Sequence, residues 1–194
     1  MICAGCGEAQ DKKAGPLLVL GDSLSSAYGM AVEQGWVALL ERRLQEQGYN
    51  YPVHNASISG DTSQGALRRL PALIEQHRPA VVIVEIGGND GLRGLPVLHL
   101  RRNLERILDL LEEHGSRALL VSMRVPPNYG AAYSSAFADS YAQATEGREA
   151  VLGRFFLDGV AQDPRLMQQD GIHPRAEAQQ KMLENVWPDL QPLL

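Results

Sequence analysis

From residue 16 onward, two hydrophobic patterns alternate along the chain. Short continuous apolar runs are typical of strands that are covered on both faces of a sheet. Stretches whose apolar residues recur every three or four positions predict amphipathic helices. The predicted strands occupy residues 16–20, 51–57, 80–86 and 117–123, with a weaker one within 150–157. Because parallel neighbours need crossover connections, this alternation predicts one three-layer α/β/α domain with helices on both faces of a five-stranded parallel sheet.

The helical pattern recurs five times between these strands. In the second of these stretches, Pro71 marks either a kink or the start of a fresh helix. The predicted helices lie around Trp36 to Gly48, around Leu67 to Ile74, around Leu104 to Leu111 with an end at His114-Gly115, at 131–147, and from Arg175 to about Trp187.

Composition narrows the class of protein. The chain has 194 residues, of which 44% are hydrophobic and 21% charged, enough for the core of one globular domain. Its net charge of −5 disfavours a nucleic-acid partner, because phosphate binding depends on clustered Lys and Arg. No apolar run approaches the roughly 18–20 residues that a membrane-spanning helix needs, so no transmembrane segment is expected.

The first fifteen residues, MICAGCGEAQDKKAG, differ from the rest and contain both cysteines, Cys3 and Cys6. "CAGC" resembles the end of a bacterial lipoprotein processing site in which Cys6 would carry the lipid, although the apolar segment that normally precedes such a site is missing. Zinc would need a second ligand pair, and a redox Cys-x-x-Cys normally opens a helix after a strand. We therefore predict a disordered leader or signal-sequence remnant at 1–15, a domain at 16–194, and a periplasmic or secreted protein with Cys6 as candidate lipid anchor.

Polar residues follow four of the predicted strands at the positions where a parallel sheet places its sites. The carboxyl ends of parallel strands meet at one edge of the sheet, and ligands bind there. The segments expected at this edge are Gly21-Asp22-Ser23-Leu24, Ser59-Gly60-Asp61, Gly87-Gly88-Asn89-Asp90 and RVPPNYG at 124–130.

A serine, a histidine and an aspartate in these loops could perform nucleophilic catalysis. Ser23 lies at a strand-to-helix turn, which exposes a hydroxyl, and a serine needs a base to become a nucleophile. His173 lies in QQDGIHPRAEA, a loop that can bring Asp170 onto one ring nitrogen and leave the other nitrogen facing a serine. Ordinary helix or strand positions account for the other four histidines, His54, His77, His99 and His114.

Acyl transfer also requires donors aimed at the developing oxyanion. Gly60 sits in a tight turn where its N–H could face the cleft, and Asn89 follows two glycines that let the backbone come close. Each of them alone is also explained as an ordinary turn residue. Together with Ser23, Asp170 and His173 they indicate an acyl-transfer site.

These motifs carry a family resemblance. "GDSL", "SGDTSQG", "GGNDGLRG" and "DGIHP" occur in the order that defines the GDSL or SGNH hydrolases, and from about residue 16 to its end the chain resembles the bacterial periplasmic thioesterase/arylesterase/lysophospholipase group of that family. The resemblance implies Ser23 as nucleophile, His173 as general base and acid, and Asp170 as the group that orients His173. It also implies three oxyanion donors: the N–H groups of Ser23 and Gly60 and the side chain of Asn89. The implied fold is flavodoxin-like, with five parallel strands in the order 2-1-3-4-5.

Apolar loops are expected to form the substrate-binding walls. Such walls favour a fatty acyl group, so the expected partner is a small-molecule ester or fatty-acyl substrate. A monomer is the favoured oligomeric state. No cofactor and no metal are expected, because acids in turns after strands, such as Asp22, Asp61 and Asp90, commonly form turns or cap helices. The candidate wall residues are Leu92, Leu95, Pro96, Val97, Val125, Pro126 and Tyr129.

Two other functions remain open at this point. A carbohydrate O-deacetylase of the same superfamily would have a shorter, more polar pocket and aromatic residues that contact the sugar. A non-catalytic ligand-binding module could do without Ser23 or His173, and this chain has both.

Overall fold

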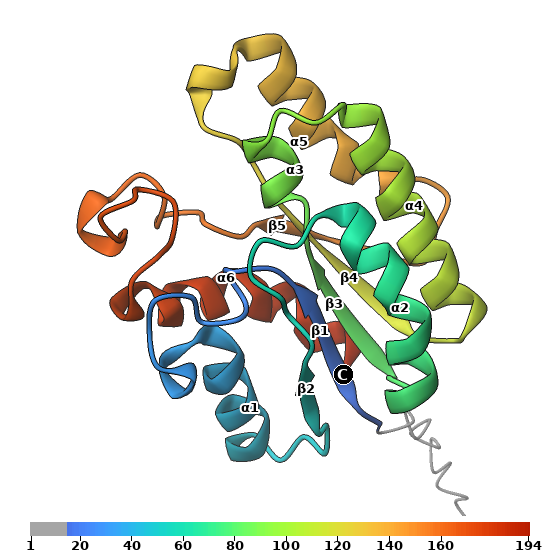
Figure 1. The fold of residues 1–194 in the computed structure, drawn as a ribbon. Coiled ribbons are helices and arrows are strands. Elements are labelled where there is room, and N and C mark those ends of the chain that lie inside the picture. The colour runs from blue at the N-terminus through green and yellow to red at the C-terminus, as the bar shows by residue number, and fades with distance from the viewer. Residues whose placement is uncertain (1–14) are drawn as a thin grey trace, which may run out of the picture.

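A five-stranded parallel sheet lies between two layers of helices in the computed structural model, which describes residues 15–194 (Figure 1). The strand order is β2-β1-β3-β4-β5. The predicted fold and strand order are therefore confirmed. The strands are β1 (Leu17–Gly21), β2 (Val53–Asn55), β3 (Val81–Glu85), β4 (Arg117–Ser122) and β5 (Val151–Phe155).

The helices are divided between the two faces of the sheet. One face is covered by α1 (Trp36–Glu46) and α6 (Gln179–Leu190), and the other by α2 (Ser63–His77), α4 (Val97–Glu113) and α5 (Ala131–Thr145) (Figure 1). A sixth helix, α3 (Gly88–Leu92), is one short turn beyond the end of β3. This division follows from right-handed crossovers, which place successive helices on either side of a parallel sheet.

The core lies against both faces of the central strands. Every residue of β1 and β3 is buried, as the continuous apolar runs predict for strands covered on both sides. The edge strand β5 instead alternates between buried and more exposed positions. On the α4 side, the predicted stripe is buried as Leu104, Ile107, Leu108 and Leu111, together with Leu100.

Three local features differ from the sequence expectations. Pro71 lies inside one continuous helix, α2, so it begins no new helix there. The strand β2 has only three residues, Val53–Asn55, because it is an edge strand that pairs with β1 alone. Helix α3 was expected to be a turn, since its five residues, two of them glycine, are too few to show a helical period.

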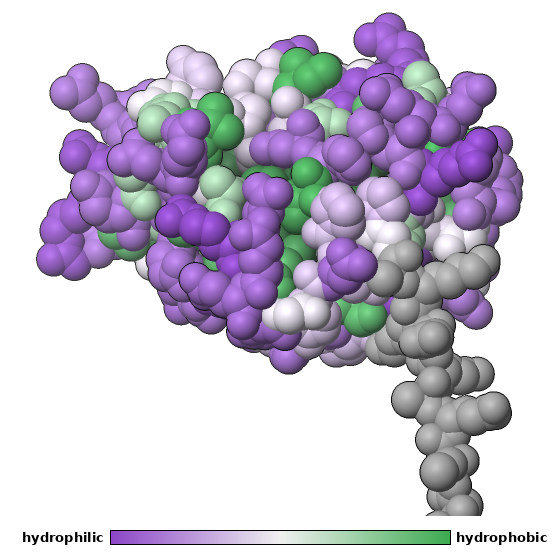
Figure 2. Space-filling model, turned by 90° about the horizontal axis from the view of Figure 1, so that it is seen from below, coloured by the Kyte–Doolittle hydropathy of each residue, from purple (hydrophilic) through white to green (hydrophobic). Residues whose placement is uncertain are grey.

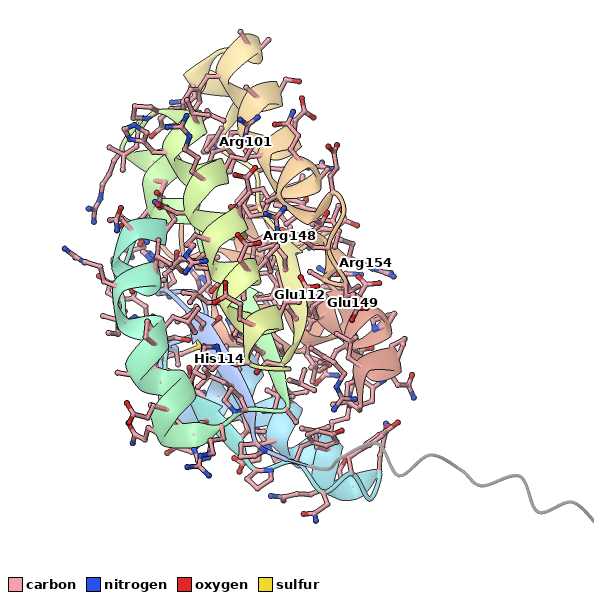
Figure 3. The ribbon with its side chains drawn as sticks, turned by 90° about the vertical axis from the view of Figure 1, so that its right-hand side faces the viewer. Arg101, Glu112, His114, Arg148, Glu149 and Arg154 are labelled. Atoms are coloured by element: carbon pink, nitrogen blue, oxygen red, sulfur yellow. The ribbon has the colours of Figure 1, made fainter. Side chains whose placement is uncertain are left out.

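Ion pairs join the outer elements away from the carboxyl edge of the sheet. Arg148 after α5 pairs with Asp109 of α4 at 2.8 Å, and Arg154 of β5 pairs with Asp189 of α6 at 3.0 Å. The two arginines lie on the side of the molecule that Figure 3 shows. Exposed pairs of this kind contribute only about 0–1 kcal/mol each. The face seen in Figure 2 is mostly hydrophilic, with small separated hydrophobic areas, as is usual for a folded domain.

The predicted leader falls almost wholly outside the described residues. The proposed lipid attachment at Cys6 therefore stays a prediction. Within residues 15–194, no helix is both long enough and apolar enough to cross a membrane.

Candidate active site

Ser23 lies in a tight turn directly after β1. The turn is closed by the Ser26 N–H, which donates to the carbonyl oxygen of Asp22 at 3.0 Å, and by the Tyr28 N–H, which donates to that of Ser23 at 3.3 Å. The Leu24 N–H donates to Oδ1 of Asp22 at 3.1 Å. The chain therefore leaves the buried strand abruptly, and Ser23 becomes half-exposed at the edge of the sheet.

Ser23 meets His173 and Asp170 in a continuous chain of hydrogen bonds. Oγ of Ser23 lies 2.9 Å from Nε2 of His173, and Nδ1 of His173 lies 2.7 Å from Oδ2 of Asp170. The hydrogen bond from the His173 side chain lowers the pKa of Asp170 to about 2, so this carboxylate is ionised at neutral pH and can only accept. Nδ1 must then carry the proton, which leaves the lone pair of Nε2 facing the serine hydroxyl.

The loop that carries His173 is fixed by its own backbone and by one glutamine. Oδ1 of Asp170 accepts the N–H groups of Ile172 at 2.9 Å and His173 at 3.0 Å. The Gln168 N–H donates to the His173 carbonyl oxygen at 2.7 Å, and Nε2 of Gln168 donates to the carbonyl oxygen of Tyr28 at 2.9 Å. The loop after β5 is thus bound to the turn after β1.

Tyr28 contacts the imidazole directly. Its ring centroid lies 4.3 Å from that of His173, with the two planes inclined by 35°. The residue before it, Ala27, has a φ of 58°, a conformation that is strained for a residue other than glycine and that persists where neighbouring contacts hold it. Sequence reasoning missed Tyr28, because nothing in its spacing indicates that it reaches His173.

The predicted oxyanion donors come from the loops after β1, β2 and β3. The N–H groups of Ser23 and Gly60 donate to no other residue within 15–194. Nδ2 of Asn89 donates one hydrogen bond, to Oδ2 of Asp22 at 3.0 Å, which leaves its second N–H for another acceptor. Ser23 and Asn89 both line the cleft described below.

Two hydrogen bonds hold the Gly60 loop against its neighbours. Oγ of Ser59 lies 2.8 Å from Oγ of Ser26 in the nucleophile turn. Nη2 of Arg93, which follows α3, donates to the Gly60 carbonyl oxygen at 2.8 Å. The three loops that carry the predicted donors are therefore cross-linked.

Asn89 is positioned by the short helix α3. The helix begins after Gly87, whose φ is 113°, and a Cβ there would lie 2.3 Å from Oη of Tyr141. Tyr141 donates from that hydroxyl to the Ile86 carbonyl oxygen at 2.9 Å. Only glycine fits at position 87, so this residue fixes where α3 starts.

Two buried carboxyl groups lie close to Ser23. Asp22 is 2% exposed and Glu85, the last residue of β3, is 0% exposed. Burial raises the pKa of Asp22 to about 6 and that of Glu85 well above its usual range, the latter also because Asp22 is near. Glu85 is anchored by Oγ of Ser25, which donates to its Oε2 at 2.7 Å and accepts from Nε1 of Trp36 at 3.1 Å.

The other acids of the edge have structural partners. Asp61 pairs with Nε of Arg69 at 2.8 Å. The carboxylate of Asp90 accepts the N–H of Ser63 at 2.8 Å and its hydroxyl at 2.6 Å, so it caps the start of α2. In the described part of the chain, no three metal-binding side chains gather at one place.

A cleft of about 560 Å³ opens beside Ser23, Asn89 and His173. Three of the seven predicted wall residues, Leu92, Val125 and Pro126, line it. The other four do not, because the chain bends into the turn before α4 at Leu95 and Pro96 and into α4 itself at Val97, while Tyr129 donates to the Leu92 carbonyl oxygen at 2.7 Å from outside the cleft.

The rest of the apolar wall comes mainly from the residue that follows β4, from the last residue of β5 and from the segment after β5. Sequence reasoning missed these residues, although the apolar positions that follow the fifth strand belong to the same sheet edge and were a usable signal. Arg124 also lines the cleft, with Cζ 4.8 Å from the centroid of the Phe155 ring. The additional apolar wall residues include Met123, Phe155, Leu157, Ala161, Met167 and Ile172.

A family model matches the part of the chain that forms this site. Residues 19–181 match the model of the GDSL-like lipase/acylhydrolase family. The chain belongs to this family. All the predicted catalytic and oxyanion residues of this GDSL hydrolase lie inside the matched region.

Characterised relatives cover nearly the whole of the GDSL hydrolase. The chain is 50% identical to esterase TesA of Pseudomonas aeruginosa over 95% of its length and 92% of the relative. It is 43% identical to an arylesterase of Vibrio mimicus over the same shares. It is also 44% identical to the thioesterase 1/protease 1/lysophospholipase L1 of Escherichia coli K12, over 93% of its own length and 86% of the relative.

Solved structures agree with the sequence relatives. The crystal structure of TesA has a TM-score of 0.90 at 50% identity and covers 92% of this chain and 99% of its own. The esterase EstA of Pseudoalteromonas sp., inhibited by monoethylphosphonate, has a TM-score of 0.88 at 40% identity, covering 92% and 97%. AlinE4, an SGNH-hydrolase family esterase, has a TM-score of 0.77 at 36% identity, covering 98% and 99%. The GDSL hydrolase is thus an enzyme that acts on ester bonds, as its sequence predicted.

Proposed function

We propose that this GDSL hydrolase cleaves carboxylic esters and acyl thioesters, including lysophospholipids, through an acyl ester on Ser23. The observation that carries the proposal is the chain of hydrogen bonds from Ser23 through His173 to Asp170, at the mouth of a largely apolar cleft. A serine that is hydrogen-bonded to an oriented imidazole is the arrangement that nucleophilic acyl transfer requires.

Acylation begins when Nε2 of His173 removes the Ser23 proton. Oγ of Ser23 attacks the acyl carbonyl carbon, and the carbonyl oxygen takes the negative charge. The N–H groups of Ser23 and Gly60 and the free N–H of Asn89 stabilise this oxyanion, and losing one such donor typically costs about 10²–10³ in rate. The imidazolium then protonates the leaving alcohol or thiol, and the ionised Asp170 stabilises the imidazolium meanwhile.

Deacylation repeats these steps with water as the nucleophile. His173 takes a proton from water, the hydroxide attacks the acyl-Ser23 ester, and the same donors hold the second oxyanion. His173 then returns its proton to Oγ of Ser23, and the carboxylic acid leaves. Since no step distinguishes a leaving alcohol from a leaving thiol, one site serves esters and thioesters alike.

The cleft favours a substrate with a hydrocarbon acyl chain. Its volume of about 560 Å³ and its many apolar wall residues suit a medium or long chain better than acetate. Discrimination per methylene in an apolar pocket is only about 1–3 kcal/mol, so the enzyme is expected to accept a range of chain lengths.

The decisive experiment measures hydrolysis of p-nitrophenyl esters, from acetate to palmitate, by the wild type and by Ser23→Ala. Ser135→Ala, at an exposed position of α5, is the control. We expect the wild type and Ser135→Ala to prefer medium or long chains, and Ser23→Ala to be inactive. Full activity of Ser23→Ala would refute the proposal. Cleavage of acetate alone would favour an O-deacetylase.

A reactive alkyl phosphonate tests the nucleophile directly. Oγ of Ser23 would bond to phosphorus, the leaving group would depart, and the serine proton would pass to His173. Mass spectrometry of the digested protein should find the adduct on the peptide that contains Ser23. An adduct on any other residue, with activity lost, would assign the nucleophile elsewhere.

A periplasmic or secreted location also belongs to this proposal, supported by the resemblance to the periplasmic enzyme group. Fractionation of cells that express the natural gene would test it. Esterase activity released with the periplasmic fraction supports it. Membrane-bound activity that Cys6→Ser releases would assign a lipid to Cys6.

A further inference from the structure

Asp22, the acid next to the nucleophile, has no role in the steps above, yet its carboxylate is almost fully buried and both of its oxygens are used. Oδ1 accepts the Leu24 N–H at 3.1 Å, and Oδ2 accepts from Nδ2 of Asn89 at 3.0 Å. Its own N–H points to Oε2 of Glu85 at 3.4 Å. The carboxylate thus joins the nucleophile turn to helix α3, which carries the proposed side-chain oxyanion donor.

The orientation of the Asn89 amide decides whether this side chain can donate to an oxyanion, and a neighbouring carboxylate can fix that orientation. A side-chain amide has a donating NH₂ end and an accepting carbonyl end of almost equal size, and its surroundings decide which end points where. Only the NH₂ end stabilises an oxyanion, because a flipped amide would present an oxygen to a negative charge. An ionised carboxylate can only accept, so it selects the NH₂ end.

Asp22 carries the charge that this selection needs. Since the pKa of Asp22 is about 6, it is largely ionised at neutral pH and above, whereas burial and the nearby Asp22 raise the pKa of Glu85 well above its usual range. The other titratable groups near Asp22 are His173, whose protonated form lowers the pKa of Asp22, and Asp61, whose carboxylate raises it. Gly88 leaves room for the carboxylate, because a Cβ there would lie 3.3 Å from Oδ2 of Asp22.

We infer that Asp22 is a positioning residue for ester hydrolysis: its carboxylate holds the Asn89 amide with Nδ2 toward the oxyanion. One hydrogen of Nδ2 bonds to Asp22, and the other is directed at the substrate oxygen. The inference rests on the proposed function, in which Asn89 is an oxyanion donor. It assigns to Asp22 a task that is separate from those of Ser23, His173 and Asp170.

A double-mutant cycle between Asp22→Asn and Asn89→Ala tests the coupling. Asparagine keeps the shape of Asp22 but has one accepting oxygen for two donors, so its NH₂ end must face either Leu24 or Asn89. We expect Asp22→Asn to lower kcat by about 10- to 100-fold with KM changed less than about threefold, since the loss is part of one oxyanion donor's contribution. In the Asn89→Ala background it should lower kcat by less than about threefold.

Glu85→Gln is the matched control, and Ser23→Ala tests the underlying function. Glu85 is buried beside Asp22 but makes no hydrogen bond to Asn89, so its substitution should change kcat by the same factor in both backgrounds. If Ser23→Ala is inactive and Asp22→Asn lowers kcat by the same factor in the wild type and in Asn89→Ala, the inference is overturned. An inactive Ser23→Ala with a fully active Asn89→Ala would also overturn it. Wild-type activity in Ser23→Ala would instead refute the proposed function.

A second measurement needs no Asp22 variant. In ¹³C- and ¹⁵N-labelled His173→Ala protein, the side-chain NH₂ signals of Asn89, identified by their loss in Asn89→Ala, are followed from about pH 5 to about pH 8, with no histidine at the site to titrate. We expect both signals to shift as Asp22 ionises. Asn89 signals that stay constant while the ¹³Cγ signal of Asp22 titrates would overturn the inference.

Discussion

Asp22→Asn should make the folded protein more stable than the wild type, by a difference that grows as the pH rises. The same substitution should lower kcat. Burial raises the pKa of Asp22 from 3.8 to about 6 in the folded state. An acid whose pKa is raised by folding binds more protons in the folded state than in the unfolded state between these two values. Folding stability therefore falls as the pH rises from 3.8 to about 6, and the penalty is complete above that range.

The magnitude follows from the same two values. A rise of about two in pKa means that the ionised Asp22 lowers the free energy of unfolding of the wild type by about 3 kcal/mol at neutral pH. Asparagine carries no charge, so it avoids this penalty at every pH, although it loses one hydrogen bond worth about 1 kcal/mol. The free energy of unfolding of Asp22→Asn minus that of the wild type should therefore rise by about 3 kcal/mol between about pH 4 and about pH 8.

Urea unfolding of both proteins at several pH values measures this difference. Asp163→Asn is the control with the opposite sign, because the hydrogen bond from the Arg165 side chain lowers the pKa of Asp163 to about 2. Its difference from the wild type should be constant above about pH 4, where the ionised carboxylate stabilises the wild type fully, and should shrink as the pH falls from about 4 to about 2. A difference for Asp22→Asn that does not change with pH would show that the buried carboxyl carries no electrostatic penalty, and the reasoning would fail.

Two further substitutions test how the site is positioned. Gly87→Ala places a Cβ 2.3 Å from Oη of Tyr141 at a φ of 113°, so it should destabilise the protein by about 2–5 kcal/mol in thermal unfolding, from backbone strain and overpacking. Tyr141→Phe should restore part of that loss, and a melting temperature unchanged by Gly87→Ala would contradict the close packing. Tyr28→Ala removes the ring whose centroid lies 4.3 Å from that of His173. An aromatic ring at this distance is expected to stabilise the imidazolium of the proposed mechanism, so kcat should fall roughly 3- to 30-fold. Tyr28→Phe keeps the ring and should stay near wild type, whereas equal losses in both variants would assign the effect to the hydroxyl.

The architecture and the meeting of Ser23, His173 and Asp170 were predictable from sequence because their signals are local. β1 and β3 appear as continuous apolar runs, and Ser23 directly follows one of them. The Asp170-x-x-His173 pair needs only a four-residue turn to bring its two side chains together. Each of these features is specified within a few positions of the chain.

The features that sequence reasoning missed depend on contacts between distant segments. Helix α3 is held by the packing of Gly87 against Tyr141, 54 positions away, rather than by its own period. Tyr28 meets His173 only because two separate loops converge. Asp22 resembled an ordinary turn residue, and its partners Asn89 and Glu85 lie 67 and 63 positions further on. The cleft wall after β5 was missed because each apolar residue there could equally belong to the core.

The separation of 150 positions between Ser23 and His173 determines when the two residues can meet during synthesis and refolding. A ribosome completes almost the entire domain before His173 emerges, so Ser23 spends most of synthesis without the imidazole that the proposed mechanism requires. Under that mechanism, the growing chain does not hydrolyse cellular esters before His173 is in place. During refolding, the return of ester hydrolysis reports the moment when the two ends of the domain have met, later than any signal from a single helix.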